Sequence, residues 1–293
     1  MVTIDPTLVS QAAKELYIRA LKVLPPDVKA ALARAHDRES HPRAREILGV
    51  MLKNLDVAEA RGLLVCQDTG TPVYKLRIGR GLEYDGPELL AAIVEGVKQA
   101  TLEHPLRSSV CHPIDRSNPQ TNTGRRIPII DVEFLEEAGY LELKMMPKGS
   151  GSENMSFLKM LTPADGLSGI KKFVLQCVVE AGGKPCPPTL VGVGIGGTSD
   201  LAMKLAKEAI WRPIGSSHPD STIAALEAEL LEAVNATGIG PMGLGGDTTA
   251  LAVQIEYAHT HITQNPVAVT LQCWRGERAM ARIYPDGHVD HGW

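Results

Sequence analysis

Thr189-Leu190-Val191-Gly192-Val193-Gly194-Ile195 carries the strongest structural signal in the chain, a short apolar run typical of a buried strand. Glycine at 192, 194 and 196 alternates with apolar residues, which is typical of a strand that packs closely under another backbone. The segments that follow predict helices near 200–210 and 220–235 and strands at 250–257, 266–273 and 278–284. Interleaved helices and strands predict a mixed α/β (α+β) fold.

The first 62 residues are predicted to be largely helical. Asp5-Pro6 is typical of a helix N-cap followed by proline at the first helical position, and this helix should run to about Val23. Further helices are predicted near 27–37 and 42–60. We therefore expect a helical region over 1–62 and an α/β region over 63–293, together forming one continuous domain.

The pattern changes after residue 62. Leu63-Leu64-Val65 and Val73–Ile78 are strand candidates, and 86–102 is predicted to be helical. Two neighbouring strands are predicted at Pro128–Phe134 and Leu141–Met146, and Thr162-Pro163 should cap a helix running towards Glu180. The long segment 105–126 shows little periodicity, and loops of this length in compact chains are more often functional than idle.

Composition excludes several classes of protein. The 293 residues are 44% hydrophobic and 22% charged with a net charge of −4, which is ordinary for a globular protein with a substantial core. No basic stripe is present, which argues against a nucleic-acid partner. No apolar run approaches the roughly 18 residues of a membrane span, and no basic-then-apolar leader opens the chain. We expect a cytoplasmic protein with no membrane partner, in a compartment where thiols stay reduced.

Five cysteines are present, an odd number that argues against a disulfide framework. Cys66, Cys186 and Cys273 lie 120 and 87 residues apart without short C-x-x-C pairs, so only a folded core could bring them together. Three converging thiolates with no fourth suit an iron–sulfur cluster whose last iron is left open for substrate. Cys177 is interpreted as core filling, and Cys111 is left without a role.

Each cysteine motif also has a structural interpretation. Cys66-Gln67-Asp68-Thr69-Gly70-Thr71 is either a polar turn with an incidental thiol or a site in which Gln67 and Asp68 face a ligand. Lys184-Pro185-Cys186-Pro187-Pro188 is a stiff segment that either places a sulfur or simply leads into a strand. Cys273 ends an alternating apolar run, where a buried cysteine is common.

Other segments suggest anion binding. In Gly149-Ser150-Gly151-Ser152 the glycines would let backbone N–H groups approach an oxyanion, although a flexible connector has the same composition. Arg107 heads the 105–126 loop and could clamp a carboxylate, and His261 could carry a proton, although surface arginines and bystander histidines are common.

Together these motifs resemble the N-terminal, cluster-binding part of the class I (iron–sulfur) fumarate hydratases. The resemblance runs in one order from about residue 40 to the C-terminus, through Cys66–Thr71, Leu106-Arg107, Asn122-Thr123-Gly124, Lys148–Asn154, Cys186-Pro187-Pro188, Ile195–Ser199 and Cys273. One departure is Ser150, where many members of the family have a third glycine.

The resemblance implies a [4Fe–4S] cluster held by Cys66, Cys186 and Cys273, with the fourth iron taking the hydroxyl and one carboxylate of malate. It implies that the residues in contact with the substrate are Gln67, Asp68, Arg107, the backbone of Gly149, Ser150 and Gly151, and His261. Asp68 and His261 would be the catalytic residues.

The resemblance also implies a partner. Single-chain members of the family carry a further C-terminal domain, whereas this chain ends at Trp293, soon after the last predicted ligand. It therefore resembles the α subunit of the two-subunit form. The implied partners are a separate β subunit carrying the C-terminal domain and a small dicarboxylic acid substrate, in a heterotetramer or larger assembly.

Four functions remain open. Thr71 and Ser152-Glu153-Asn154 are more similar to fumarate hydratases, so we expect interconversion of (S)-malate and fumarate. Cys273-Trp274-Arg275 is shared with the related L(+)-tartrate dehydratase α subunit, which is the alternative. A dinucleotide-binding oxidoreductase is remoter, and rests on the formal G-x-G-x-x-G match at Gly192–Gly197. A non-catalytic assembly subunit with structural cysteines is the last.

Overall fold

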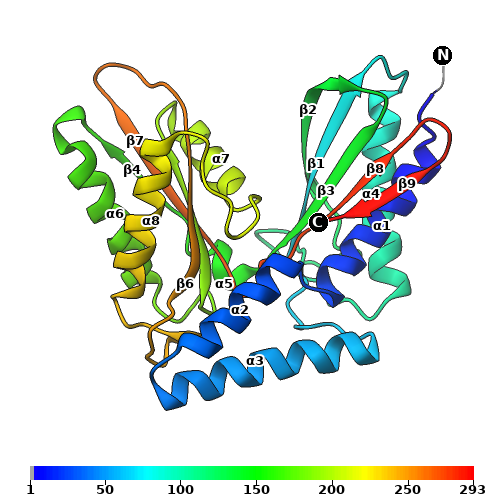
Figure 1. The fold of residues 1–293 in the computed structure, drawn as a ribbon. Helices are drawn as coiled ribbons and strands as arrows, with labels where there is room; N and C mark the ends of the chain where they lie inside the picture. Colours follow the sequence, from blue (N-terminus) through cyan, green and yellow to red (C-terminus); the bar gives the residue numbers. More distant parts are fainter. Residues whose placement is uncertain (1–2) are drawn as a thin grey trace. The chain divides into compact units, whose positions relative to one another are not determined.

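The chain folds into two compact units in a computed structural model that describes residues 3–293, without the side chains of residues 137 and 138. The first unit comprises Met1–Pro25, Leu55–Ser150 and Glu277–Trp293, and the second comprises Pro26–Asn54 and Gly151–Gly276. Each contains one mixed sheet, so the predicted mixed α/β fold is confirmed (Figure 1). The assignment of 1–62 and 63–293 to separate regions stays a prediction.

The first unit is a five-stranded sheet covered on one face by two helices. Its strands lie in the order β2-β1-β3-β8-β9, with β1 and β2 parallel and the other pairs antiparallel. Apolar side chains from β1, β3 and β8 pack with those of α1 and α4 in one core. The element bounds are α1 Pro6–Lys22, β1 Thr71–Arg80, α4 Gly86–Glu103, β2 Ile129–Ala138, β3 Leu141–Lys148, β8 Ala279–Ile283 and β9 Val289–Gly292.

Helix α1 begins where the sequence predicts it. Asp5 is the N-cap, and its Oδ1 accepts a hydrogen bond from the Thr7 N–H at 2.8 Å, with Pro6 at the first helical position. Leu16, Tyr17 and Leu21 point into the core, and Tyr17 donates from its hydroxyl to the Thr69 carbonyl at 3.0 Å. Helix α1 thereby supports the predicted turn at residues 66–71.

The second unit has helices on both faces of a four-stranded sheet. The strand order is β4-β7-β5-β6, in which β5 and β6 are parallel and the other pairs antiparallel. Helices α6 and α8 form a core with one face, and α7 packs on the other (Figure 1). The bounds are α2 Pro26–Arg38, β4 Phe157–Leu161, α6 Gly166–Ala181, β5 Thr189–Ile195, α7 Ser199–Ala209, α8 Ser221–Asn235, β6 Ala250–Tyr257 and β7 Asn265–Gln272. Short 3₁₀ helices occupy Pro163–Asp165 and Pro241–Gly243.

Two helices span the boundaries between the units. Helix α3, Pro42–Arg61, contains the boundary between Asn54 and Leu55, and the single-turn helix α5, Ser150–Glu153, begins where the first unit ends. Two expectations about strands are wrong. Leu63-Leu64-Val65 is not a strand, and β2 and β3 are not neighbours, because β1 pairs between them.

Candidate functional site

The Cys66–Thr71 segment forms a supported turn in the first unit. The Val65 N–H donates to the Leu21 carbonyl at 3.0 Å just before it, and Thr69 is fully buried. Gly70 has φ +66°, and a Cβ there would lie 2.8 Å from the Lys148 nitrogen, so only glycine fits. Cys66 and Gln67 remain exposed at the start of the turn. The predicted ligand and substrate residues of this motif therefore stand on a rigid, accessible base.

Asp68 is brought together with the predicted glycine loop. Its Oδ1 accepts from the Gly70 N–H at 3.0 Å, and its Oδ2 accepts from the Ser150 N–H at 3.0 Å and from the Ser150 hydroxyl at 3.4 Å. The sequence predicts that the backbone N–H groups of this loop approach an oxyanion. Here that oxyanion is the carboxylate of Asp68. Two backbone donors aimed at different oxygens fix the orientation of the carboxylate.

Arg107 projects an exposed guanidinium from a firmly held backbone. Its carbonyl accepts from the Thr69 hydroxyl at 2.5 Å and from the Asn122 side-chain amide at 3.1 Å. The first bond ties Arg107 to the turn that carries Asp68. Within residues 3–293 the guanidinium has no ion pair, so it is available for an anion.

Asn122 holds the backbone around Arg107 in place, a role that the sequence analysis did not predict. It is fully buried, with φ 54°. Its amide oxygen accepts from the Ser109 N–H at 2.7 Å, and its nitrogen donates to the Thr101 hydroxyl at 3.3 Å as well as to the Arg107 carbonyl. Asn122 thus joins helix α4 to the backbone on both sides of Ser108. Its only sequence signal was membership of the Asn122-Thr123-Gly124 segment.

Cys186 and Cys273 lie on adjoining segments of the second unit. The Trp274 N–H donates to the Cys186 carbonyl at 3.2 Å, and the Met242 N–H donates to the Pro187 carbonyl at 2.8 Å. Cys186 is exposed with φ 57°, and Cys273 is buried at the end of β7. The backbone segments that carry two of the three predicted ligands therefore adjoin in the fold, although 87 residues separate Cys186 from Cys273 in sequence.

Gly151 and His261 occupy different parts of the same unit. A Cβ at Gly151 would lie 2.9 Å from the Lys184 carbonyl oxygen, so Gly151 sits against the segment that leads to Cys186. His261 is exposed in the β6–β7 connection, with its Nδ1 2.9 Å from the Thr263 hydroxyl. Strand β7, Asn265–Gln272, separates His261 from Cys273 by roughly 26 Å of extended chain at about 3.3 Å per residue. The catalytic role of His261 stays a prediction.

Cys66, Cys186 and Cys273 are the thiols that the resemblance assigns to an iron–sulfur cluster. Thiolates are the ligands that iron–sulfur clusters require, and two thiols stand on hydrogen-bonded segments of one unit, whereas Cys66 belongs to the other. Over residues 3–293, no group of three or more His, Cys, Asp or Glu side chains is gathered closely enough to hold a metal ion. The residue types fit a cluster, and its binding stays a proposal.

The glycine run has a packing explanation. A Cβ at Gly192 would lie 2.2 Å from the Ala206 carbonyl oxygen, and one at Gly194 would lie 1.9 Å from that of Ala202, both on α7. The expected close approach of another backbone is confirmed. Asp220, at the spacing of a ribose-binding acid, is the N-cap of α8 and accepts from the Thr222 N–H at 2.8 Å. These contacts account for the motif without a dinucleotide.

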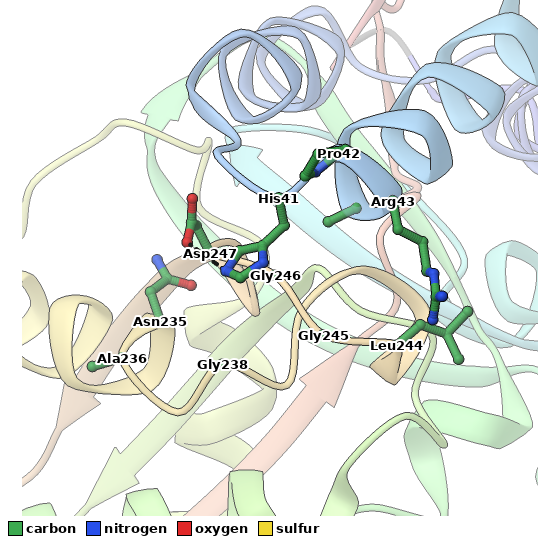
Figure 2. Close-up of a pocket in the computed structure, with 11 residues that line it drawn as sticks. His41, Pro42, Arg43, Asn235, Ala236, Gly238, Leu244, Gly245, Gly246 and Asp247 are labelled. Atoms are coloured by element: carbon green, nitrogen blue, oxygen red, sulfur yellow. Dashed lines mark ion pairs between the residues drawn. The ribbon is translucent and has the colours of Figure 1, made fainter.

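A separate pocket of about 710 Å³ in the second unit contains none of the predicted site residues (Figure 2). His41 Nε2 lies 3.7 Å from Asp247 Oδ1, where α3 meets the loop after α8. Hydrogen bonds from Ser40 hold the pKa of Asp247 below its usual value, and the Asp247 N–H donates to both oxygens of buried Glu39 at 2.9 and 3.1 Å. These bonds hold the loop after α8 against the start of α3, so Asp247 and Glu39 have a structural role here.

None of the helices within residues 3–293 combines the length and apolar character needed to cross a bilayer.

Comparison with known proteins gives consistent matches. A family model described as fumarate hydratase (Fumerase) matches residues 10–282. The chain is 49% identical over 283 residues to a Methanocaldococcus jannaschii protein that carries the provisional name L(+)-tartrate dehydratase subunit alpha, covering 96% of this chain and 99% of that one. It is 34% identical over 263 residues to L(+)-tartrate dehydratase subunit alpha of Escherichia coli strain UTI89, covering 90% and 86%. It is 33% identical, with the same coverage, to the protein of that name from Shigella sonnei.

Proposed function

The chain belongs to the fumarate hydratase (Fumerase) family of hydro-lyases, and from that premise we propose that it is the α subunit of an L(+)-tartrate dehydratase. The observation that carries the substrate is the name shared by relatives aligned over nearly the whole of this chain. Our sequence analysis placed (S)-malate and fumarate first and tartrate second; the relatives favour the second. Malate and fumarate remain the other candidate pair, because the matching family model is described as fumarate hydratase.

Arg107 is proposed to bind one carboxylate of the substrate. Its exposed guanidinium has the fork geometry that matches a carboxylate, and its backbone is fixed by Thr69 and Asn122. Because Thr69 lies next to Asp68 in the chain, the bound carboxylate would be held in a set position relative to the Asp68 carboxylate.

Asp68 is proposed to orient the reacting part of the substrate and to hold a proton. The Gly70 and Ser150 N–H groups fix its two oxygens, so it meets the substrate without rearrangement. Gln67, exposed beside it, offers an amide to a second polar group of the substrate. The backbone of Gly149, Ser150 and Gly151 completes the proposed contacts. His261 of this chain is left out of them, because strand β7 lies between it and Cys273.

Cys66, Cys186 and Cys273 would hold a [4Fe–4S] cluster. When bound, the cluster supplies a Lewis acid that makes a substrate hydroxyl a better leaving group. The proposal requires thiolates from both compact units, two from the neighbouring segments at 186 and 273 and one from the turn at 66.

A second chain is part of the proposal. Relatives that align along almost their whole length are named as alpha subunits, which supports a separate β partner. A substrate with two carboxylates needs a second cationic clamp besides Arg107, and we propose that the β subunit supplies it within a heterotetramer or larger assembly in the cytoplasm.

The test is a substrate comparison with the complete complex. The α chain would be produced anaerobically with the β subunit encoded beside it, and the complex assayed on L(+)-tartrate and on (S)-malate. Loss of water from tartrate leaves the enol of oxaloacetate, which an NADH-linked dehydrogenase detects, whereas malate gives fumarate, which absorbs in the ultraviolet. Preference for tartrate supports the proposal. Turnover of malate with none of tartrate makes the second candidate correct, and turnover of neither refutes both.

A further inference from the structure

In the loop over residues 105–126, the proposed function uses Arg107 and Asn122, which holds the Arg107 backbone, and leaves the other arginines without a role. The loop joins α4 to β2 within the first unit and contains four arginines against one aspartate, in a chain whose net charge is −4. Arg107, Arg116, Arg125 and Arg126 are all exposed. In the described part of the chain, none of these guanidinium groups forms an ion pair or hydrogen bond. The loop therefore presents a local excess of positive charge that the α chain does not neutralise.

The single acid of the loop offsets only one of the four positive charges, and its carboxylate is bonded within its own turn rather than to an arginine. Asp115 Oδ1 accepts from the Ser117 N–H at 2.9 Å and from its hydroxyl at 2.7 Å, and lies 3.1 Å from His112 Nδ1. The same turn exposes Ile114, of which 86% is accessible to solvent. An apolar side chain at the tip of a charged loop is typical of an anchor at an interface.

The loop is also held in one shape before any partner binds. Asn118 Oδ1 accepts from the Ser108 hydroxyl at 2.9 Å and from the Gln120 N–H at 2.7 Å, and Asn122 fixes the loop to α4. Four non-glycine residues adopt left-handed backbone conformations, with φ between 54° and 63°: Arg116, Gln120, Asn122 and Arg126. Such conformations persist where the surroundings enforce them, and they cluster at functional surfaces. A preorganised loop loses little entropy on binding.

We infer that the 105–126 loop is the surface on which the β subunit docks, through an acidic segment that faces Arg116, Arg125 and Arg126 and an apolar pocket that receives Ile114. This inference rests on the proposed function, which requires a separate β chain. Opposite charge across an interface steers association and fixes its register. Arg107 lies near the start of the loop, so a chain bound here adjoins the group assigned to the substrate carboxylate. The loop contains Arg107, and the proposed site needs a further cationic group that we assign to the β subunit. This favours the β subunit, rather than a second copy of the α chain, as the partner that binds the loop.

A charge-reversal experiment tests the inference. Purified α chain is titrated with purified β subunit by calorimetry, comparing wild type with Arg125→Glu/Arg126→Glu. The matched control is Arg61→Glu/Arg80→Glu, which makes the same change of charge at exposed arginines elsewhere in the first unit. We expect the loop variant to weaken binding by about 100-fold at low salt and the control by less than about 3-fold. Binding of the wild type should also weaken as salt rises, more steeply than that of the loop variant.

A second variant tests the apolar contact. Because Ile114 is almost fully exposed, Ile114→Ser removes nothing from the α core, and it should weaken binding of β by about 10-fold. Equal affinities for the loop variant and the control overturn the inference, as does the absence of α–β binding at any salt concentration. Self-association of α that Arg125→Glu/Arg126→Glu abolishes would assign the loop to a second copy instead. A complex that forms through the loop yet dehydrates neither acid would refute the proposed function and leave the docking surface intact.

Discussion

Asp68 has the most closely defined hydrogen-bond geometry among the proposed site residues of the first unit. Both oxygens accept from backbone N–H groups, so replacement by asparagine forces an amide N–H against one of those donors. We expect Asp68→Asn to lower kcat/KM of the complete complex by at least about 100-fold, with a loss of roughly 1–3 kcal/mol in the free energy of unfolding. Steady-state kinetics and denaturant unfolding measure the two effects separately.

Ser150→Ala is the matched control for this prediction. It keeps the N–H that donates to Asp68 at 3.0 Å and removes only the hydroxyl at 3.4 Å. The variant should retain activity within about threefold, since a contact of that length contributes little. Full activity in Asp68→Asn would contradict the assigned role, and equal losses in both variants would indicate that disturbance of the loop was responsible.

Asn122 is expected to act on substrate binding through Arg107. Asn122→Gly tolerates φ 54° and removes every side-chain bond, including the one to the Arg107 carbonyl. We expect KM for the dicarboxylate to rise about tenfold with a smaller change in kcat, because the clamp loses its position while Asp68 keeps its own. A fall in kcat alone, with KM unchanged, would argue against this route. The comparison variant is Asn118→Gly, which removes side-chain bonds to the neighbouring Ser108 and none to Arg107 itself, and it should change KM less.

At the scale of elements, most helices and strands with a strong local signal were predicted, whereas the pairing of β2 with β1 rather than β3 was not. Asp5-Pro6 predicted the start of α1, and Thr189–Ile195 predicted β5 to the residue, because capping and apolar runs are properties of short segments. Strand β4, Phe157–Leu161, was missed, since an edge strand with three exposed residues lacks the apolar alternation of a buried one. The position of β1 between β2 and β3 depends on pairing between distant residues, for which a single sequence holds no local signal.

The close packing of α7 against the glycines of β5 leads to a prediction about stability. In Gly194→Ala the new methyl would lie 1.9 Å from the Ala202 carbonyl oxygen, so α7 must shift away from β5. We expect a loss of about 2–4 kcal/mol in the free energy of unfolding, at or above the usual range for overpacking because the opposing atom is backbone. Gly49→Ala in α3 is the control: its methyl would be 3.6 Å from His36, and it should stabilise by up to about 1 kcal/mol. Thermal unfolding of both variants measures these changes. An unchanged free energy of unfolding in Gly194→Ala would contradict the packing explanation.

At the scale of the whole molecule, the residues proposed for the site are divided between the two compact units. Asp68, Arg107 and Cys66 belong to one, and Cys186 and Cys273 to the other. Motifs in the sequence proposed all of these residues, and their roles stay predictions. Within single units, the Ser150 N–H donates to Asp68, and the Trp274 N–H donates to the Cys186 carbonyl.

The cysteines carry the last prediction, because cluster binding must use thiols from both units if the proposal is right. After anaerobic reconstitution with iron and sulfide, Cys66→Ser, Cys186→Ser and Cys273→Ser should each lose the visible absorbance and bound iron of a [4Fe–4S] cluster, whereas Cys177→Ser should retain both. Burial raises the pKa of the Cys177 thiol to about 12, so it stays protonated and is a poor ligand. Loading should also raise the melting temperature of the wild type, since a ligand bound only by the folded chain stabilises it, and the three serine variants should show no such rise. A Cys66→Ser protein that held a full complement of iron and gained the same stability would mean that the second unit binds metal by itself.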